Sequence, residues 1–361
     1  MEPLTVNLHK AIAEIYIGPG ASEHLNKYKA YLKHYQKSTV LPSPEKAIYQ
    51  IDRPPLGSHA HIEHLVTKLR DEPTITRLQF ENVLCAGKET LEQESQHAIR
   101  TILRVGFMLD CVSKSSKASR KGVRSQWQSS ESFADFVARR IPKSEQGILI
   151  PDEDITASAV WRLKQRSGVR IEKTDDIADH LLYNPDTRVL KIFHQMAYLR
   201  AQLRRSQGVA ASLDLESSLK RGTLPPQLIM ETLESFYRIL FPIADEKTGR
   251  SKRLLRRMIR LHGFDQQCAI ELEPTRWHPE DFQYLYWGDR LQVISEIAGR
   301  TVAQNRYMAW IERHTAERQA LSVAIAGLVL SAVFGFLAVV VSASQLAVQV
   351  VAWKYPVAMS S

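Results

Sequence analysis

The stretch "RQALSVAIAGLVLSAVFGFLAVVVSASQLAVQVVAWKYP" (318–356) decides the fold, because it holds no charged residue from Gln319 to Trp353. As a helix, the 23 residues from Ala320 to Ser342 would be about 35 Å long, which matches a bilayer hydrocarbon core about 30 Å thick. The apolar run continues to Ala352, and a helix of that length, about 48 Å, is too long for a straight crossing and too short for two. The sequence therefore predicts one tilted transmembrane helix over 318–352 and a short tail over 353–361.

The alternative is a buried helix in the core of a large globular domain. Such helices are usually shorter and rarely lack a polar face over so many turns. The length of the uncharged run therefore favours a membrane segment.

The charges that flank this segment predict its orientation. Arg300, Arg306, Arg313 and Arg318 precede it, whereas only Lys354 follows it. Because cationic residues are retained on the cytosolic side, the N-terminal body is expected in the cytosol, in a tail-anchored layout. The high apolarity and the single distal lysine favour the endoplasmic reticulum over the mitochondrial outer membrane. The side chains expected at the membrane interfaces are Trp310, Arg313, Arg318, Trp353, Lys354 and Tyr355.

Small residues recur along the predicted transmembrane helix at steps of three and four, which places them on one face. Such a face lets a second backbone approach closely, so it predicts a homo-oligomer formed through this helix. The alternative is that alanine, glycine and serine are simply common in membrane helices. The stripe consists of Ala320, Ala324, Gly327, Ser331, Gly335, Ala338 and Ser342.

Composition bounds the remainder of the 361-residue chain. Its 44% of apolar residues allows a sizeable core, and its formal charge of +9 predicts an anionic partner: lipid headgroups, nucleic acid or an acidic protein. Three cysteines without a C-x-x-C pair exclude a disulfide framework and give no sign of zinc or redox chemistry. The N-terminal stretch lacks a long apolar run, so it does not look like a signal peptide. These features fit the reducing cytosol.

Turn signals divide the body into segments. Proline-rich breaks predict that residues 1–58 form a helical or loose N-terminal arm, followed by a helical region over 59–112. Residues 113–150 combine a basic, serine-rich linker with further breaks. The remaining helical body is expected over 151–316.

Within that body the pattern predicts a small sheet among helices. The stretch "TASAVWRLKQRSG" (156–168) indicates a helix, "VRIEKT" (169–174) a strand, and "LLYNPDTRVLKIFH" (181–194) a β-hairpin around an Asn-Pro-Asp turn. Such an order is typical of a winged helix, so the fold is expected to be mainly α with a winged-helix-like segment and a C-terminal transmembrane helix. The basic residues that this segment would offer to nucleic acid are Arg162, Lys164, Arg166, Arg170, Arg188 and Lys191.

The stretch "GRSKRLLRRMIRLHG" (249–263) contains six cations and no acidic residue. Its spacing predicts a helix with one apolar side, and two interpretations of the basic side are open. It either lies against anionic lipid headgroups, where each cation gives about 1 kcal/mol, or is merely solvated. The cations are Arg250, Lys252, Arg253, Arg256, Arg257 and Arg260.

Signs of catalysis are weak. The stretch "SHAHIEH" (58–64) offers His59, His61 and His64, which could bind zinc, but no alternating strand–helix pattern supports a metal site, and the sequence favours a surface cluster without metal. Around Gly87-Lys88, Asn82 and Glu89 break the phosphate-loop pattern. The sequence therefore predicts no metal and no cofactor, and it favours a protein that is not an enzyme.

Four stretches carry a resemblance to a known group of proteins. The chain resembles proteins of filamentous fungi that have a helical cytosolic body and one C-terminal transmembrane segment, over residues 60 to 345. The resemblance implies a fungal origin and a membrane location, and it assigns no functional residue. The stretches are "SAVWRLKQRSGVRIEKTDDIADHLLYNPDTRVLKIFHQMAYLRAQL", "LPPQLIMETLESFYRILFP", "YLYWGDRLQVISEI" and "WIERHTAERQALSVAIAGLVLSAVFGFL".

These observations predict a tail-anchored protein that works by binding, as a membrane-held scaffold for a cytosolic protein whose identity the sequence does not give. Its expected partners are the lipid bilayer, anionic headgroups and further copies of itself. Two alternatives are a metal-dependent enzyme using the histidine cluster and a nucleic-acid-binding protein using the winged-helix-like segment.

Overall fold

The computed structural model describes residues 5–39, 56, 58–85, 92–111, 126–242, 249–270, 282–299 and 320–354. The chain divides into two compact units, called unit 1 (Met1–Arg300) and unit 2 (Thr301–Ser361).

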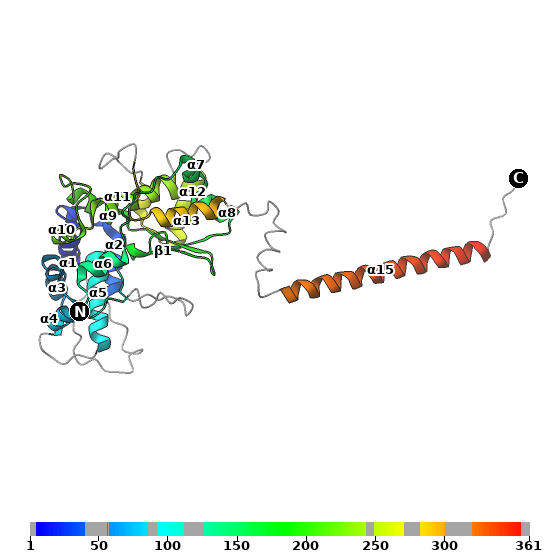
Figure 1. Ribbon diagram of the computed structural model, residues 1–361, viewed down its shortest axis with the longest axis horizontal. Helices are drawn as coiled ribbons and strands as arrows, with labels where there is room; N and C mark the ends of the chain where they lie inside the picture. The colour runs from blue at the N-terminus through cyan, green and yellow to red at the C-terminus, as the bar shows by residue number, and fades with distance from the viewer. Residues whose placement is uncertain are drawn as a thin grey trace. The chain divides into compact units, whose positions relative to one another are not determined.

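Unit 1 is mainly helical with one small sheet (Figure 1). Its first elements are α1 (Val6–Ile12), η1 (Ala13–Ile17), η2 (Ala21–Tyr28), α2 (Lys29–Thr39), α3 (His59–Asp71), α4 (Arg77–Cys85), α5 (Glu92–Phe107) and α6 (Phe133–Arg140). There follow α7 (Asp152–Ala157), α8 (Val160–Arg166), β1 (Arg170–Thr174), η5 (Ile177–Asp179), β2 (Tyr183–Asn184), β3 (Val189–Phe193) and α9 (Met196–Arg205). The last are α10 (Leu215–Lys220), α11 (Pro226–Glu234), η6 (Ser235–Leu240), α12 (Arg250–His262), η7 (Gln266–Ala269) and α13 (Gly288–Gly299).

Helix α5 forms the centre of the first half of unit 1. Its apolar residues Ile99, Ile102 and Leu103 recur at helical spacing and are almost fully buried against α2, α3 and α4. Helices α3 and α5 approach so closely at Gly106 that a Cβ atom there would lie 2.8 Å from the Val66 side chain. Only glycine allows this packing.

The N-terminal segment belongs to the same core. Tyr16, Tyr31 and Tyr35 are each about 1% exposed. Tyr31 stacks on Tyr198 of α9, with ring centroids 5.3 Å apart, and its hydroxyl donates to the Val105 carbonyl at 2.7 Å. Within the described range, the expected N-terminal arm is therefore helical and packed rather than loose.

The sheet has the order β1-β3-β2, with β1 parallel and β2 antiparallel to β3. The Asn184 side chain accepts the backbone N–H groups of Asp186 and Thr187, which closes the turn between β2 and β3 as an Asx turn. Leu190 and Ile192 alternate into the core along β3. The expected mainly helical fold with a small hairpin is confirmed.

Helix α11 begins at Pro226, where a proline needs no hydrogen-bond partner, and then runs through the core. Its Glu231 is fully buried and accepts the backbone N–H groups of Leu285, Tyr286 and Trp287 at 2.7 to 2.9 Å. Burial raises the pKa of this carboxyl although the hydrogen bonds oppose the rise. One carboxylate therefore holds the segment that leads into α13.

Replacing Glu231 by glutamine should lower the free energy of unfolding by about 2 kcal/mol, because an amide NH₂ would face N–H donors that the carboxylate now accepts. Chemical denaturation of residues 1–300 measures the loss. The control is Glu216→Gln, which touches only an exposed i,i+4 pair with Lys220 and should change stability by less than about 0.5 kcal/mol. Equal effects of the two changes would show that Glu231 does not hold the segment.

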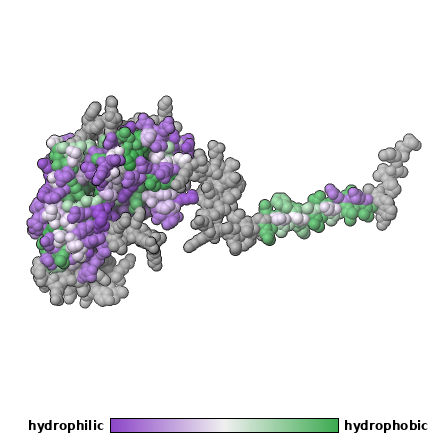
Figure 2. All heavy atoms as spheres, viewed as in Figure 1, coloured by the Kyte–Doolittle hydropathy of each residue, from purple (hydrophilic) through white to green (hydrophobic). Residues whose placement is uncertain are grey.

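Unit 2 is described over a single continuous helix, α15 (Ala320–Lys354), which begins and ends two residues later than the expected segment. The stretch Leu330–Val350 has a mean hydropathy of 2.0 and is not buried in the structure, so it is long and apolar enough to cross a membrane. Figure 2 shows hydrophobic side chains along this helix.

Candidate functional site

Helix α12 starts and ends at glycines in the left-handed region, Gly249 (φ 60°) and Gly263 (φ 65°). The Gly263 N–H donates to the Met258 carbonyl, which closes the last turn. Leu255 and Met258 are buried and face α8 and η7. The predicted amphipathic basic helix is therefore present, with its apolar side used by the core of unit 1.

The opposite side of α12 is exposed and cationic. Like charges at i,i+3 and i,i+4 positions destabilise a helix by about 0.2–0.5 kcal/mol per pair, so the cations of this face lower the stability of α12 itself. In the part of the chain that the structure describes, no carboxylate forms an ion pair with Lys252, Arg256 or Arg260. The exposed cations are the six predicted ones: Arg250, Lys252, Arg253, Arg256, Arg257 and Arg260.

The cationic surface continues onto α8. The Arg250 guanidinium lies 4.8 Å from the ring centroid of Trp161, and the Arg162 guanidinium lies 5.0 Å from the same ring. Lys164 and Arg166 of α8 are exposed. Lys173 of β1 donates to the Gly263 carbonyl at 2.8 Å. Its positive charge at the C-terminus of α12 interacts favourably with the helix dipole. We call α12 together with α8 the basic face.

The histidine cluster lies at the start of α3, where the Ser58 hydroxyl accepts the His61 N–H. His59 is hydrogen-bonded to the Tyr35 hydroxyl through Nδ1 at 2.9 Å. Burial lowers the pKa of His61, and His64 lowers it further. Among the described residues, no group of three or more His, Cys, Asp or Glu side chains is placed to hold a metal ion.

Several predicted membrane residues lie outside the described residues: Trp310, Arg313, Arg318 and Tyr355. Ala320, Ala324, Gly327, Trp353 and Lys354 belong to α15, but their side chains are outside the described part. The remaining stripe residues, Ser331, Gly335, Ala338 and Ser342, are exposed along α15. Self-association through this stripe stays a prediction.

A pocket of about 680 Å³, which the sequence did not reveal, opens among η1, η2, α9 and the turn after α10. These helices belong to the same end of unit 1 (Figure 1). Glu14 shapes its rim by accepting the backbone N–H groups of Gly20 and Ser22 at 3.1 and 3.0 Å. A hydrogen bond from the Ser22 side chain, together with these backbone hydrogen bonds, lowers the pKa of Glu14. The polar side chains in its lining are His24, Lys27, Tyr28, Arg204, Arg205, Ser206, Arg221 and Thr223.

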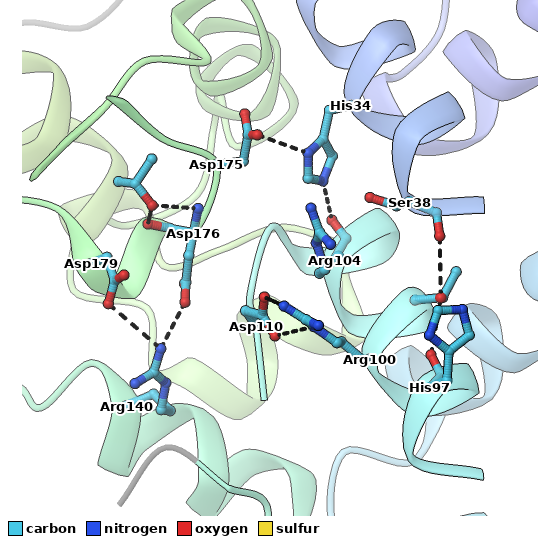
Figure 3. A network of polar contacts seen from close by, with 12 residues as sticks. His34, Ser38, His97, Arg100, Arg104, Asp110, Arg140, Asp175, Asp176 and Asp179 are labelled. Carbon is cyan, nitrogen blue, oxygen red and sulfur yellow. Dashed lines mark hydrogen bonds and ion pairs between the residues drawn. The ribbon is translucent and has the colours of Figure 1, made fainter. Parts of the chain in front are cut away.

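A network of polar side chains around Asp175 and His34, which no pattern in the sequence predicted, links distant segments of unit 1 (Figure 3). Asp265 donates its backbone N–H to His194 Nδ1, so His194 donates through Nε2 to the Asp175 carboxylate at 3.0 Å. On the other side of Asp175, His34 Nδ1 lies 3.4 Å away, while His34 Nε2 donates to the Arg104 carbonyl at 3.1 Å. Both histidines are buried. The contact joins α2, α5 and the segment after β1.

Charge balance explains why Asp175 is tolerated there. Burial alone would raise the pKa of its carboxyl, but hydrogen bonds from His194 and His34 outweigh burial and hold the pKa well below its ordinary value. The Gln195 amide donates a further hydrogen bond at 2.8 Å.

The neighbouring carboxylates in Figure 3 are also paired. Arg100 binds Asp110 through two hydrogen bonds, and Arg140 donates to Asp176 at 2.7 Å. Asp176 also caps η5, because its side chain accepts the backbone N–H of Ala178. These side chains fasten elements of unit 1 together, and burial, with the nearby Asp179 carboxylate, raises the pKa of Asp176 to about 7.

No protein-family model, curated protein or solved structure matches the chain. The resemblance to fungal membrane proteins stays a prediction, and the functional argument rests on geometry.

Proposed function

We propose that this chain is a membrane-anchored binding protein, in which α15 crosses the bilayer and unit 1 works at its cytosolic surface. The observation that carries the proposal is the composition of α15: an uncharged span, Leu330–Val350, with every described side chain exposed. On the scale of membrane insertion, each Leu, Val or Phe at the centre of a helix contributes about 0.3–0.6 kcal/mol, so the large apolar side chains of this span together favour insertion by several kcal/mol.

The orientation follows from the arginines before α15, from Arg300 to Arg318, which oppose a single lysine after it. The endoplasmic reticulum is the membrane that the high apolarity favours. The direct test is protease protection on intact microsomes with a tag at each end, alongside alkaline carbonate extraction. A digested N-terminal tag, a protected C-terminal tag and carbonate resistance support the proposal. Carbonate release of the protein overturns it.

The basic face is the surface that we propose lies on anionic lipid. Residues 300–319 join unit 1 to α15, and a chain of that length spans at most about 70 Å, so the headgroups are within reach of unit 1 when α15 is in the bilayer. A cation near an anionic leaflet gives about 1 kcal/mol of binding free energy, so the six exposed cations of α12 together could hold unit 1 at the membrane surface. Trp161, between two guanidinium groups, adds an interfacial aromatic ring.

Changing Arg253, Arg256, Arg257 and Arg260 to glutamate should lower the partition of residues 1–300 onto phosphatidylserine-containing vesicles at least about tenfold, because attraction to the leaflet becomes repulsion. Vesicle co-sedimentation measures it. The matched control changes four exposed lysines outside the basic face to glutamate, which alters the net charge by the same amount. These are Lys10, Lys29, Lys33 and Lys37.

If both variants lose vesicle binding equally, binding depends on the net charge of unit 1 and not on the basic face. Tight binding of duplex DNA, with a steep dependence on salt and loss in the α12 variant, would favour the nucleic-acid alternative instead.

A further inference from the structure

The pocket of unit 1 gathers positively charged side chains from three parts of the chain. Lys27 comes from η2, Arg204 and Arg205 from the end of α9, and Arg221 from the turn after α10. The residues that line the pocket include no Asp or Glu, and no described carboxylate forms an ion pair with the three arginines. Because the pocket is concave, these charges act on the same small volume.

One guanidinium in this cluster lacks a partner where it is buried. Arg205 Nη1 is shielded from solvent and has no hydrogen-bond partner among the described residues. Arg70 lies near it, and its Nε and Nη2 atoms are also buried without partners. Burial and the nearby charge of Arg70 both disfavour the charged form of Arg205, so an anion in the pocket would offset that cost.

The backbone has been adapted to hold Arg205 in place. Gly18 has φ 136°, and a Cβ atom at this position would lie 2.9 Å from Arg205 Cδ. A side chain at residue 18 would therefore be strained and would displace the arginine stem. Arg204, beside it, donates to the Tyr28 hydroxyl at 3.2 Å, which fixes a second guanidinium at the pocket.

We propose that this pocket binds a small molecule carrying two or more clustered phosphate groups. Its volume lies in the range of about 300–1,000 Å³ that is usual for small-molecule sites. Guanidinium groups match phosphate oxygens with paired hydrogen bonds, and each phosphate monoester carries about −1.5 to −2 charges at pH 7. The cations of the lining outnumber its aromatic rings, which are those of His24 and Tyr28, so the proposal rests on recognition of the phosphates. The ligand is either a soluble phosphorylated polyol or the headgroup of a phosphoinositide.

This inference goes beyond the proposed function, because the pocket shares no residue with α12 or α15. The test uses the full chain reconstituted in phosphatidylcholine nanodiscs, with inositol trisphosphate as the probe and calorimetry as the readout. Saturable binding at physiological salt is expected. Its absence overturns the proposal, while leaving the membrane anchor and the basic face untouched.

A second arm identifies the source of the phosphates. Nanodiscs that also contain phosphatidylinositol bisphosphate should weaken binding of the soluble probe if the lipid headgroup is the ligand. Unchanged binding of the probe assigns the pocket to a soluble ligand. Either result supports a phosphate site.

Variants locate the binding. Arg205→Gln and Arg221→Gln should each weaken inositol trisphosphate binding about tenfold or more, since each loses a charge-assisted hydrogen bond. The matched control, Lys37→Gln, removes one positive charge from the exposed surface of α2 and should change affinity less than about twofold. Equal weakening by all three changes, or parental affinity in Arg205→Gln, overturns the assignment.

A folding defect is distinguished by thermal unfolding without ligand. Arg205→Gln removes a charge that no described carboxylate pairs with and a long hydrogen bond of 3.5 Å from Nη2 to the Arg221 carbonyl, so its melting temperature should stay close to that of the parent, whereas the rise in melting temperature on adding the probe should be lost. If this variant fails to fold, Arg221→Gln decides the question, because its side chain is exposed.

Discussion

Replacing Phe336 and Val340 together by arginine should transfer the full-length protein from the membrane fraction to the soluble fraction. Both residues lie near the middle of the Leu330–Val350 span and are four positions apart, on one helix face. An arginine at the centre of a membrane helix costs about 2.5–3.5 kcal/mol on insertion, so the pair shifts the equilibrium by roughly three to five powers of ten. Cell fractionation followed by alkaline carbonate extraction measures the result.

The matched control replaces the same two residues by leucine, which keeps the span apolar and should leave the protein resistant to carbonate. Circular dichroism of the released arginine variant checks that unit 1 is still folded, as expected from its separate core. Retention of the arginine variant in the carbonate-resistant pellet would show that α15 is not the membrane anchor.

Local patterns of the sequence were sufficient for the elements that depend on short-range spacing. The uncharged run predicted α15 to within two residues at each end, and the cation-rich stretch between Gly249 and Gly263 predicted α12. The Asn-Pro-Asp turn predicted the β2–β3 hairpin, because Asn184 closes it with its own side chain. In each case, the residues that determine the element lie within one or two turns of each other.

The pairing of distant segments could not be predicted in this way. The prolines after the N-terminal segment predicted a separate arm. Tyr31 of this segment is stacked on Tyr198, so the segment is part of the core. Likewise, the pocket combines Lys27 with Arg205 and Arg221, which are unremarkable cations in their own helices and turns. The local sequence signal was the turn Gly18-Pro19-Gly20, but this turn lines a pocket only because α9 packs beside it.

Among the single substitutions proposed, a change at the half-buried Asp175 should have the largest effect on folding. Asp175→Ala would leave His194 Nε2 and the Gln195 amide without their acceptor, and would remove the anion that faces His34. Loss of a partner in a buried charged cluster destabilises by about 3 kcal/mol or more. Chemical denaturation of residues 1–300 at pH 7 measures the change.

The control is Asp175→Asn, whose carbonyl oxygen still accepts from His194 and whose NH₂ can donate to a neutral His34 Nδ1, so a loss of about 1 kcal/mol is expected. If alanine and asparagine destabilise equally, hydrogen-bond geometry is not what Asp175 contributes. If neither destabilises, the link between α2 and the segment after β1 does not support the fold.

The same residue predicts how stability depends on pH. Because the pKa of Asp175 is well below its ordinary value in the folded protein, the unfolded chain takes up a proton near pH 4 while the folded chain does not. The contribution of Asp175 is therefore fully present above the unfolded pKa of about 3.9 and decreases as the pH falls below it, by up to 1.4 kcal/mol per pH unit. Between pH 5 and pH 3 the parent should lose about 1 kcal/mol more than Asp175→Asn, which has no carboxyl to titrate. Parallel stability curves for the two proteins over that interval would show that the two histidines do not hold the Asp175 carboxylate ionised.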